Sequence, residues 1–509
     1  MREILVDGES LRLEDFIRVV KHGWKVKIAP GVKEKVNRSR EFIDRAIGSR
    51  SVIYGITTGF GDLAKVMIPP DKIRELQRNL IRSHASGVGD PFPPEIVKGA
   101  MLLRLNTLAK GYSGVRYELL EFLAEMINRD ICPYVPKKGS VGASGDLAPL
   151  AHIALAMMGE GEVFYKGKLT SASLALKEEL LPPMVFDAKE GLALINGTSM
   201  MASIGGVALH EALRILKIAD ISLSLSLEAL KGIPDAFDPR IHALRPHPGQ
   251  MECARNVLKL IDGSEIIYLH PSKERPQDAY SLRCAPQVHG ASRDAISFFK
   301  LLLEREFNSV TDNPLVFPDD GKILSGGNFH GEPLAIGMDL VTIALSEVAS
   351  ISERRIARLV DGHLSGLPDF LIFSRGLNSG FMIPQYVAAA LVSENKILSS
   401  PASVDSIPTS ANQEDHVSMG MNSALKLLNV IDNVYKVLSI EVLLSCQGID
   451  FRKPLKPGRG TSRAYSLIRE EVPFLMEDAP LYVEISKVEK ILREDRFLSF
   501  VEEAVNGLL

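Results

Sequence analysis

Cysteine is scarce in this chain, and the few cysteines present do not form a pattern. The 509 residues include four cysteines, and no two of them have the CxxC spacing of a metal or redox motif; they are Cys132, Cys253, Cys284 and Cys446. A long chain with few, scattered thiols is typical of a reducing compartment and not of a disulfide-stabilised secreted protein. We therefore expect a cytoplasmic protein without structural disulfides.

Strong charge of one sign and long apolar runs are also absent. The formal net charge is -4, and Lys and Arg do not cluster among aromatics, so we expect neither nucleic acid nor an anionic lipid surface as a partner. No uncharged apolar stretch reaches the ~18 residues of a membrane span. The first residues, MREILVDGESLRLEDF, lack the apolar core of a signal peptide.

Helical periodicity is present, above all in the second half of the chain. Apolar residues recur along one helical face from Leu340 to Leu359, and the segment Thr409–Arg452 contains no proline; both features predict long, buried helices. The first half has short β-branched runs between Gly- and Pro-rich loops, including the loop 132–149. We predict a mainly α fold, with a loop-rich mixed N-terminal domain over 1–200 that carries this loop and a helical bundle domain over 201–509.

One loop has a residue order that suggests chemistry. It reads GSVGASGDLAPLAH over 139–152 and resembles the signature of the aromatic amino acid ammonia-lyases and aminomutases. In that family Ala-Ser-Gly cyclises without help into 4-methylideneimidazole-5-one (MIO), which implies a prosthetic group formed here from Ala143, Ser144 and Gly145. The tripeptide also occurs at 85–87, but in a segment that resembles another part of the family, so the prediction rests on Ser144 and not on Ser86.

Ring closure explains the residue types in this loop. The amide nitrogen of Gly145 must attack the carbonyl carbon of Ala143, and a residue without Cβ permits that close approach. Ser144 then loses its hydroxyl as water, which leaves a conjugated exocyclic double bond, and Asp146 is the neighbouring candidate for assisting proton transfer. The histidines show no HExxH or comparable spacing and no nucleotide-binding loop is evident, so the expected cofactor is the chain itself, without metal or nucleotide.

Further segments resemble the family's active-site motifs, in family order. Tyr54 lies in YGITTGFG, where the family places an acid or base, and Tyr280 in QDAYSLRC competes for that role. In the same segment Arg283 suits a bidentate clamp on the substrate carboxylate, and Gln277 resembles a residue lining the site. Asn196, in LINGT, is implied to hold the substrate carboxylate or the MIO carbonyl.

The residues expected around the substrate's ring bear on which amino acid is bound. His84, Glu414 and Met382 resemble the histidine-specific members, and a carboxylate at 414 can accept a hydrogen bond from an imidazole N–H. Phe329, in SGGNFHG, resembles the aromatic residue beside the prosthetic group. Three positions instead resemble tyrosine-specific members; they are Thr57, Ser199 and Ala285. Because an unmatched buried polar contact costs more than a lost methylene, we weight His84 and Glu414 most and predict elimination of ammonia from L-histidine, giving trans-urocanate.

Other readings remain within and outside the family. Tyrosine or phenylalanine ammonia-lyase activity and tyrosine 2,3-aminomutase activity stay open as alternatives. The fumarase and argininosuccinase type of helical lyase is disfavoured because its Gly-Ser-Ser-x-Met-Pro loop is absent, and a non-catalytic scaffold would be expected to have lost Ser144, Tyr54 or Arg283. The resemblance implies a fumarase/aspartase-like helical architecture, a small amino acid as substrate, and a homotetramer in which each active site is assembled from three subunits.

Overall fold

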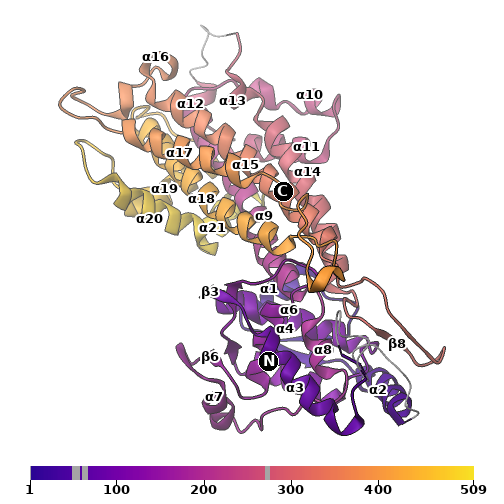
Figure 1. Ribbon diagram of the computed structural model, residues 1–509. Helices are drawn as coiled ribbons and strands as arrows, with labels where there is room; N and C mark the ends of the chain where they lie inside the picture. The colour runs from indigo at the N-terminus through magenta and orange to yellow at the C-terminus, as the bar shows by residue number, and fades with distance from the viewer. Residues whose placement is uncertain (1, 49–57, 60–66, 270–275) are drawn as a thin grey trace. The chain divides into compact units, whose positions relative to one another are not determined.

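The computed structural model describes residues 2–48, 58–59, 67–269 and 276–509, and helices dominate it (Figure 1). The chain divides into two compact units made of interleaved segments. The first unit comprises Met1–His210, Lys300–Asp339 and Pro401–Leu425. The second unit comprises Glu211–Phe299, Leu340–Ser400 and Lys426–Leu509. The mainly α fold class predicted from the sequence is confirmed, and the predicted boundary near residue 200 stays a prediction.

The helices of the first unit pack around α4 (Pro94–Ala109). From Ile96 onward nearly every side chain of α4 is buried, because this helix is apolar on all faces and has neighbours on several of them. It packs against α1, α2 and α5. The other helices of this unit are α1 (Leu13–Val20), α2 (Val32–Gly48), α3 (Ile73–His84), α5 (Tyr117–Asn128), α6 (Leu147–Met157), α7 (Ala172–Glu178) and α8 (Glu190–Ile195).

Short strands connect these helices. The parallel pair is β1 (Glu3–Val6) with β2 (Lys25–Ile28), and the antiparallel ladders are β3 (Val88–Pro91) with β5 (Pro136–Lys138), β6 (Glu162–Tyr165) between β4 (Cys132–Pro133) and β7 (Lys168–Ser171), and β8 (Leu315–Phe317) with β9 (Lys322–Leu324). The strand β5 matters for function, because the loop that carries the predicted prosthetic group begins directly after it and ends at α6.

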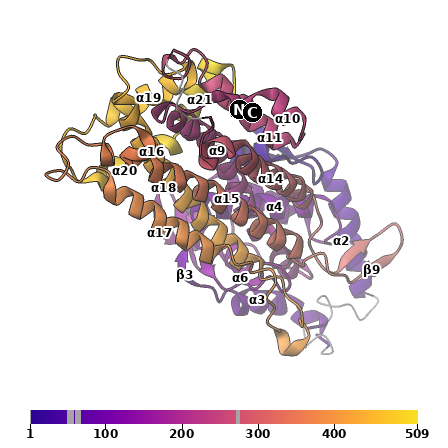
Figure 2. The same cartoon turned by 90° about the horizontal axis from the view of Figure 1, so that it is seen from above.

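Long helices build the core of the second unit. Four of them contribute residues to both units: α9 (Ser199–Ala229), α14 (Ala285–Phe307), α15 (Glu332–Val360) and α18 (Gly420–Asp450). In both views α15 and α18 run beside α17 (Met382–Leu398) (Figures 1 and 2). The stripes expected from periodicity face the core, as the burial of Val348 in α15 and of Leu438 in α18 illustrates.

A buried ion pair links three of these helices within the second unit. The guanidinium of Arg355 in α15 donates to Glu441 in α18 at 2.9 Å, and the hydroxyl of Ser226 in α9 donates to the same carboxylate at 2.6 Å. Arg355 and Glu441 are both fully buried. Such a pair is costly to break from one side, because the remaining charge would lie unpaired in the core.

By length and composition α15 is apolar enough to cross a membrane, with a mean hydropathy of 1.7 in its most apolar stretch. Within the protein 67% of that stretch is buried, as in a core helix. The remaining α-helices are α10 (Pro239–Ala243), α11 (Pro248–Leu260), α12 (Glu265–Tyr268), α13 (Tyr280–Arg283), α16 (Gly362–Ser365), α19 (Arg459–Glu471), α20 (Leu481–Arg493) and α21 (Asp495–Val505). Short 3-10 helices are η2 (Pro70–Lys72), η3 (Pro234–Phe237), η4 (Asp369–Leu371) and η5 (Ser410–Asn412).

Candidate active site

The Ala143-Ser144-Gly145 turn is held in a tight conformation between β5 and α6. Gly145 has a φ of +74°, a left-handed conformation that favours glycine. A Cβ on Gly145 would overlap the carbonyl group of Gly197. Ala143 is buried and packs with Val417 and Met419 in a small apolar cluster. The turn thus has close neighbours on two sides.

A second turn, Asn196-Gly197-Thr198, lies directly alongside. The amide of Gly197 donates to the carbonyl of Ser144 at 3.2 Å, and the amide of Asp146 donates to the carbonyl of Gly197 at 2.7 Å. The two segments therefore form a parallel bridge at Gly145 and Gly197. This pairing needs glycine at 197, where φ is +146° and a Cβ would overlap Arg104 and Thr311.

Asp146, which follows the tripeptide, is fully buried. Its carboxylate accepts hydrogen bonds from the amide of Met201 at 2.8 Å and from the hydroxyl of Ser140 at 3.3 Å. Burial raises the pKa of Asp146 to about 7, although these hydrogen bonds favour the charged form. A carboxyl group with this pKa can both accept and release a proton near neutral pH.

Ser144 makes a hydrogen bond to a residue in the last segment of the first unit. Its hydroxyl donates to Oε1 of Glu414 at 3.0 Å, and Oε2 of Glu414 accepts from the hydroxyl of Thr409 at 2.8 Å. His84, at the end of α3, is half-buried, and burial lowers its pKa while the nearby charge of Glu414 acts in the opposite direction. The structure thus brings together Ser144, Glu414 and His84, all predicted from the sequence.

Asn196 is buried, and its side chain already makes hydrogen bonds within the protein. The amide nitrogen donates to the carbonyl of Asn313 at 3.0 Å and lies 3.4 Å from Asp312. These contacts fix the turn beside Ser144, and the predicted contact of Asn196 with substrate or MIO stays a prediction. Phe329 is half-buried in the loop before α15.

The other predicted residues belong to the second unit or to undescribed segments. In α13 the guanidinium of Arg283 lies 4.5 Å from the ring centroid of Tyr280, and its Nε donates to the carbonyl of Asp278 at 3.0 Å. Tyr280 is 70% exposed, and Gln277 is exposed as well. Met382 is half-buried at the start of α17. Tyr54 and Thr57 lie outside the described residues.

Sequence reasoning missed a group of buried charges behind the two turns. Arg104 lies within α4, and its Nη1 donates to the carbonyl of Asn196 at 2.7 Å. Lys189, just before α8, pairs with Asp312 at 2.6 Å, and both side chains are fully buried. The detectable signal was a charged residue inside the apolar stretch MLLRLNTLA of α4, since a charge there needs a buried partner.

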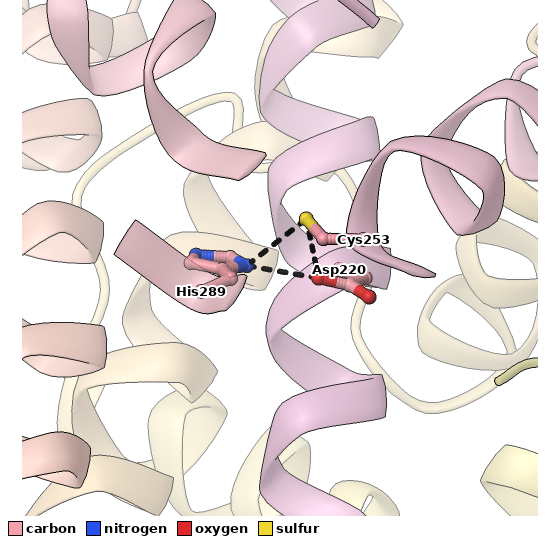
Figure 3. Close-up of side chains that lie close together, drawn as sticks. All are labelled: Asp220, Cys253 and His289. Carbon is pink, nitrogen blue, oxygen red and sulfur yellow. Dashed lines mark hydrogen bonds and ion pairs between the residues drawn. The ribbon is translucent and has the colours of Figure 1, made fainter. Parts of the chain in front are cut away.

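The second unit contains another cluster of ligand-type side chains, shown in Figure 3. The carboxylate of Asp220 lies 2.8 Å from Nδ1 of His289 and 3.1 Å from Sγ of Cys253. It also pairs with Arg293 and accepts from the side-chain amide of Asn256 at 2.9 Å. Because Arg293 and these hydrogen bonds hold the pKa of Asp220 well below its usual range, we interpret this cluster as a buried ion pair of the core.

Comparisons with known proteins agree with the site. The family model of the aromatic amino acid lyases matches residues 11–470. The histidine ammonia-lyase of Caldanaerobacter subterraneus subsp. tengcongensis is 53% identical over 99% of both chains. Two solved structures are also similar: histidine ammonia-lyase from Trypanosoma cruzi (42% identity, TM-score 0.91, covering 99% of this chain and 95% of that one) and tyrosine aminomutase from Streptomyces globisporus (38% identity, TM-score 0.95, covering 99% of both).

The match extends over nearly the whole chain and includes the turn at Ser144, the turn at Gly197 that pairs with it and the acidic segment at Glu414. The family model covers most of the sequence, and the full-length relatives are about half identical to it. Both findings assign the chain to the same family. This chain belongs to the aromatic amino acid lyase family.

Proposed function

We propose that this protein eliminates ammonia from L-histidine to give trans-urocanate, using an electrophile formed from Ala143, Ser144 and Gly145. The observation that carries the proposal is the position of the Glu414 carboxylate, 3.0 Å from the hydroxyl of Ser144 and close to His84. A carboxylate beside the reactive turn can accept a hydrogen bond from an imidazole N–H, for which a phenyl ring has no equivalent donor. Full-length relatives that bear the name histidine ammonia-lyase support the same substrate.

The residues present fit the MIO group. Gly145 and Gly197 pack closely at this turn, and neither position leaves room for a Cβ. Gly197 would hold the group by donating its amide hydrogen to the Ser144 carbonyl. When formed, the group supplies an electrophilic carbon that makes the amine a better leaving group. Asp146, with a pKa of about 7, is suited to move protons during ring closure and dehydration.

The remaining steps are carried by side chains. We assign the substrate carboxylate to the guanidinium of Arg283, whose planar donors match a carboxylate in pairs, and the imidazole ring to Glu414 and His84. Tyr54 or Tyr280 removes the proton from the β-carbon. Gln277, Phe329 and Met382 line the site. No metal or nucleotide is assigned a role.

We further propose that the active sites form in a cytoplasmic homotetramer. Tyr280 is 70% exposed in the single chain, whereas a catalytic base must be shielded from water to act on a weakly acidic proton. On α17 the apolar side chains Ile383, Tyr386 and Val387 share one face, and all three are exposed. An apolar helix face of this kind is typical of a surface that other subunits cover.

Tyrosine is the second candidate substrate, either for elimination or for amine migration to a β-amino acid. The 38% identity to a tyrosine aminomutase over 99% of both chains supports it, as do Thr57, Ser199 and Ala285. Against it stand His84 and Glu414, which resemble the histidine-specific members of the family.

The test is to incubate the purified protein separately with L-histidine, L-tyrosine and L-phenylalanine. We expect conjugated-acid absorbance with histidine, at a kcat/KM about a hundredfold above the other two. Chromatography of the tyrosine reaction would detect a β-amino acid, and the Ser144→Ala protein serves as the blank. Equal or faster reaction of tyrosine would contradict the proposal.

A further inference from the structure

One peptide group connects a buried cation to the reactive turn. The peptide between Asn196 and Gly197 has its carbonyl oxygen on Asn196 and its N–H on Gly197. The carbonyl accepts a hydrogen bond of 2.7 Å from Nη1 of Arg104. The N–H of the same peptide donates to the carbonyl of Ser144 at 3.2 Å. Arg104 is therefore linked to Ser144 through a single planar amide.

The charge of Arg104 is directed mainly at this peptide. Arg104 is only 2% exposed, and its Nε and Nη2 have no hydrogen-bond partner in the described part of the chain. Two acids, Asp312 and Asp146, act on Arg104 through their charges, and Asp312 itself pairs with Lys189 at 2.6 Å. Burial lowers the pKa of Arg104 to about 10, which leaves the guanidinium charged at neutral pH.

A charged donor at one end of an amide strengthens the donor at its other end. Hydrogen bonds to a charged group are roughly twice as strong as neutral ones, and bonds in a chain polarise one another, especially in a buried environment. Electron density drawn toward the Asn196 oxygen makes the Gly197 N–H more positive. The Ser144 carbonyl consequently meets a stronger donor than an ordinary backbone amide.

We propose that Arg104 is a positioning residue that makes the reactive turn more electrophilic, acting through the Asn196–Gly197 peptide on the Ser144 carbonyl. The inference rests on the proposed MIO group. Ring closure between Gly145 and Ala143 consumes the carbonyl of Ala143 and leaves that of Ser144 conjugated with the new double bond. A strong donor at this oxygen withdraws electron density from the double bond and so favours attack by a nucleophile.

Cyanide provides a direct test that does not require turnover. The cyanide carbon forms a bond to the exocyclic methylidene carbon, and the π electron pair of the double bond moves into the ring toward the carbonyl. A proton from water neutralises the resulting anion. The exocyclic double bond is then gone, so the absorbance of the conjugated group disappears. We expect this loss to be about tenfold slower in Arg104→Gln and Arg104→Met, a factor that corresponds to replacing a charge-assisted hydrogen bond by a neutral one or by none. Arg104→Lys keeps a buried charge, and its rate should fall between these variants and wild type.

Arg40→Met is the matched control. Arg40 is also buried and also donates to a backbone carbonyl, that of Ala188, at 2.9 Å, and it pairs with Asp44 at 2.8 Å. Its acceptor peptide is not the one whose N–H donates to Ser144. Thermal unfolding identifies variants that have lost stability, and we expect Arg40→Met to react with cyanide within twofold of wild type. If the neutral variants do not fold, Arg104→Lys decides the question. A wild-type cyanide rate in every folded Arg104 variant would overturn the inference.

Intact mass separates this inference from the proposed function. Wild type and the folded Arg104 variants should all be lighter than the encoded chain by two water molecules. A wild-type protein of full encoded mass would refute the MIO group itself. Two lost waters in all proteins, together with equal cyanide rates, would refute only the role of Arg104.

Discussion

The hydroxyl of Ser144 donates a hydrogen bond of 3.0 Å to the carboxylate of Glu414, a residue 270 positions further along the chain. The contact joins the residue that would become the electrophile to the residue that would select the substrate. It is formed within the first unit, which takes in segments from both halves of the chain. Replacing Ser144 should therefore abolish the reaction, whereas replacing Glu414 should change which amino acid reacts.

Ser144→Ala should fold normally and lose activity by at least about 10³-fold, because no double bond can form without the hydroxyl. Its intact mass should exceed that of mature wild type, because the water that it retains outweighs the one oxygen that the substitution removes. Ser86→Ala is the matched control, because Ser86 lies in the other Ala-Ser-Gly tripeptide and its hydroxyl donates to the backbone carbonyl of His84 at 3.4 Å. Turnover by Ser144→Ala at the wild-type rate would refute the assignment.

Glu414→Gln should lower kcat/KM for histidine by about tenfold or more, because the amide oxygen of Gln still accepts a hydrogen bond but the charge that strengthens this bond is lost. The effect on any residual tyrosine turnover should be much smaller. Asp415→Asn removes a neighbouring exposed acid and should change neither rate by more than twofold. An unchanged histidine rate in Glu414→Gln would remove the main support for the substrate.

Asp146 should make stability depend on pH. The folded protein holds the Asp146 proton up to about pH 7, whereas the unfolded chain releases it near 4. This contribution to stability is fully present below pH 4 and is lost as the pH rises toward 7, by up to about 1.4 kcal/mol per pH unit. Urea unfolding at several pH values should show a shallower decline for Asp146→Asn, and parallel pH profiles would contradict the raised pKa.

Gly197→Ala should destabilise the protein by about 2 kcal/mol or more, because the new Cβ overlaps Arg104 and Thr311 at a backbone conformation that favours glycine. Gly48→Ala is the control, since a Cβ at the end of α2 meets no atom of the described residues. Urea unfolding measures both changes. Equal stability of the two variants would mean that the turns are less closely packed than described.

Much of the fold could be predicted from local patterns. The apolar stripe of α15 indicates which of its faces is buried, and the absence of proline from the segment of α18 permits a long helix. Both helices appear where these patterns predict them. The interleaving could not be predicted, because the segments 300–339 and 401–425 join the first unit through contacts that have no local sequence signature. Helix periodicity reports a buried face and not the identity of what covers it.

The same distinction applies to the site. Ser144, Glu414 and His84 were predicted from motifs, and the structure places them together. Arg104 was not predicted, because its partner is a backbone carbonyl 92 positions away, and any residue type can supply a carbonyl. Only the presence of an arginine among the apolar residues of α4 indicated that a buried acceptor had to exist.

Two residues that pack against Ala143, namely Val417 and Met419, are translated long after it. A ribosome that has translated the tripeptide must still make most of the chain before these residues exist. The loop of a nascent polypeptide therefore lacks this apolar contact until residue 419 has been translated, so the packing around Ala143 is completed late in synthesis.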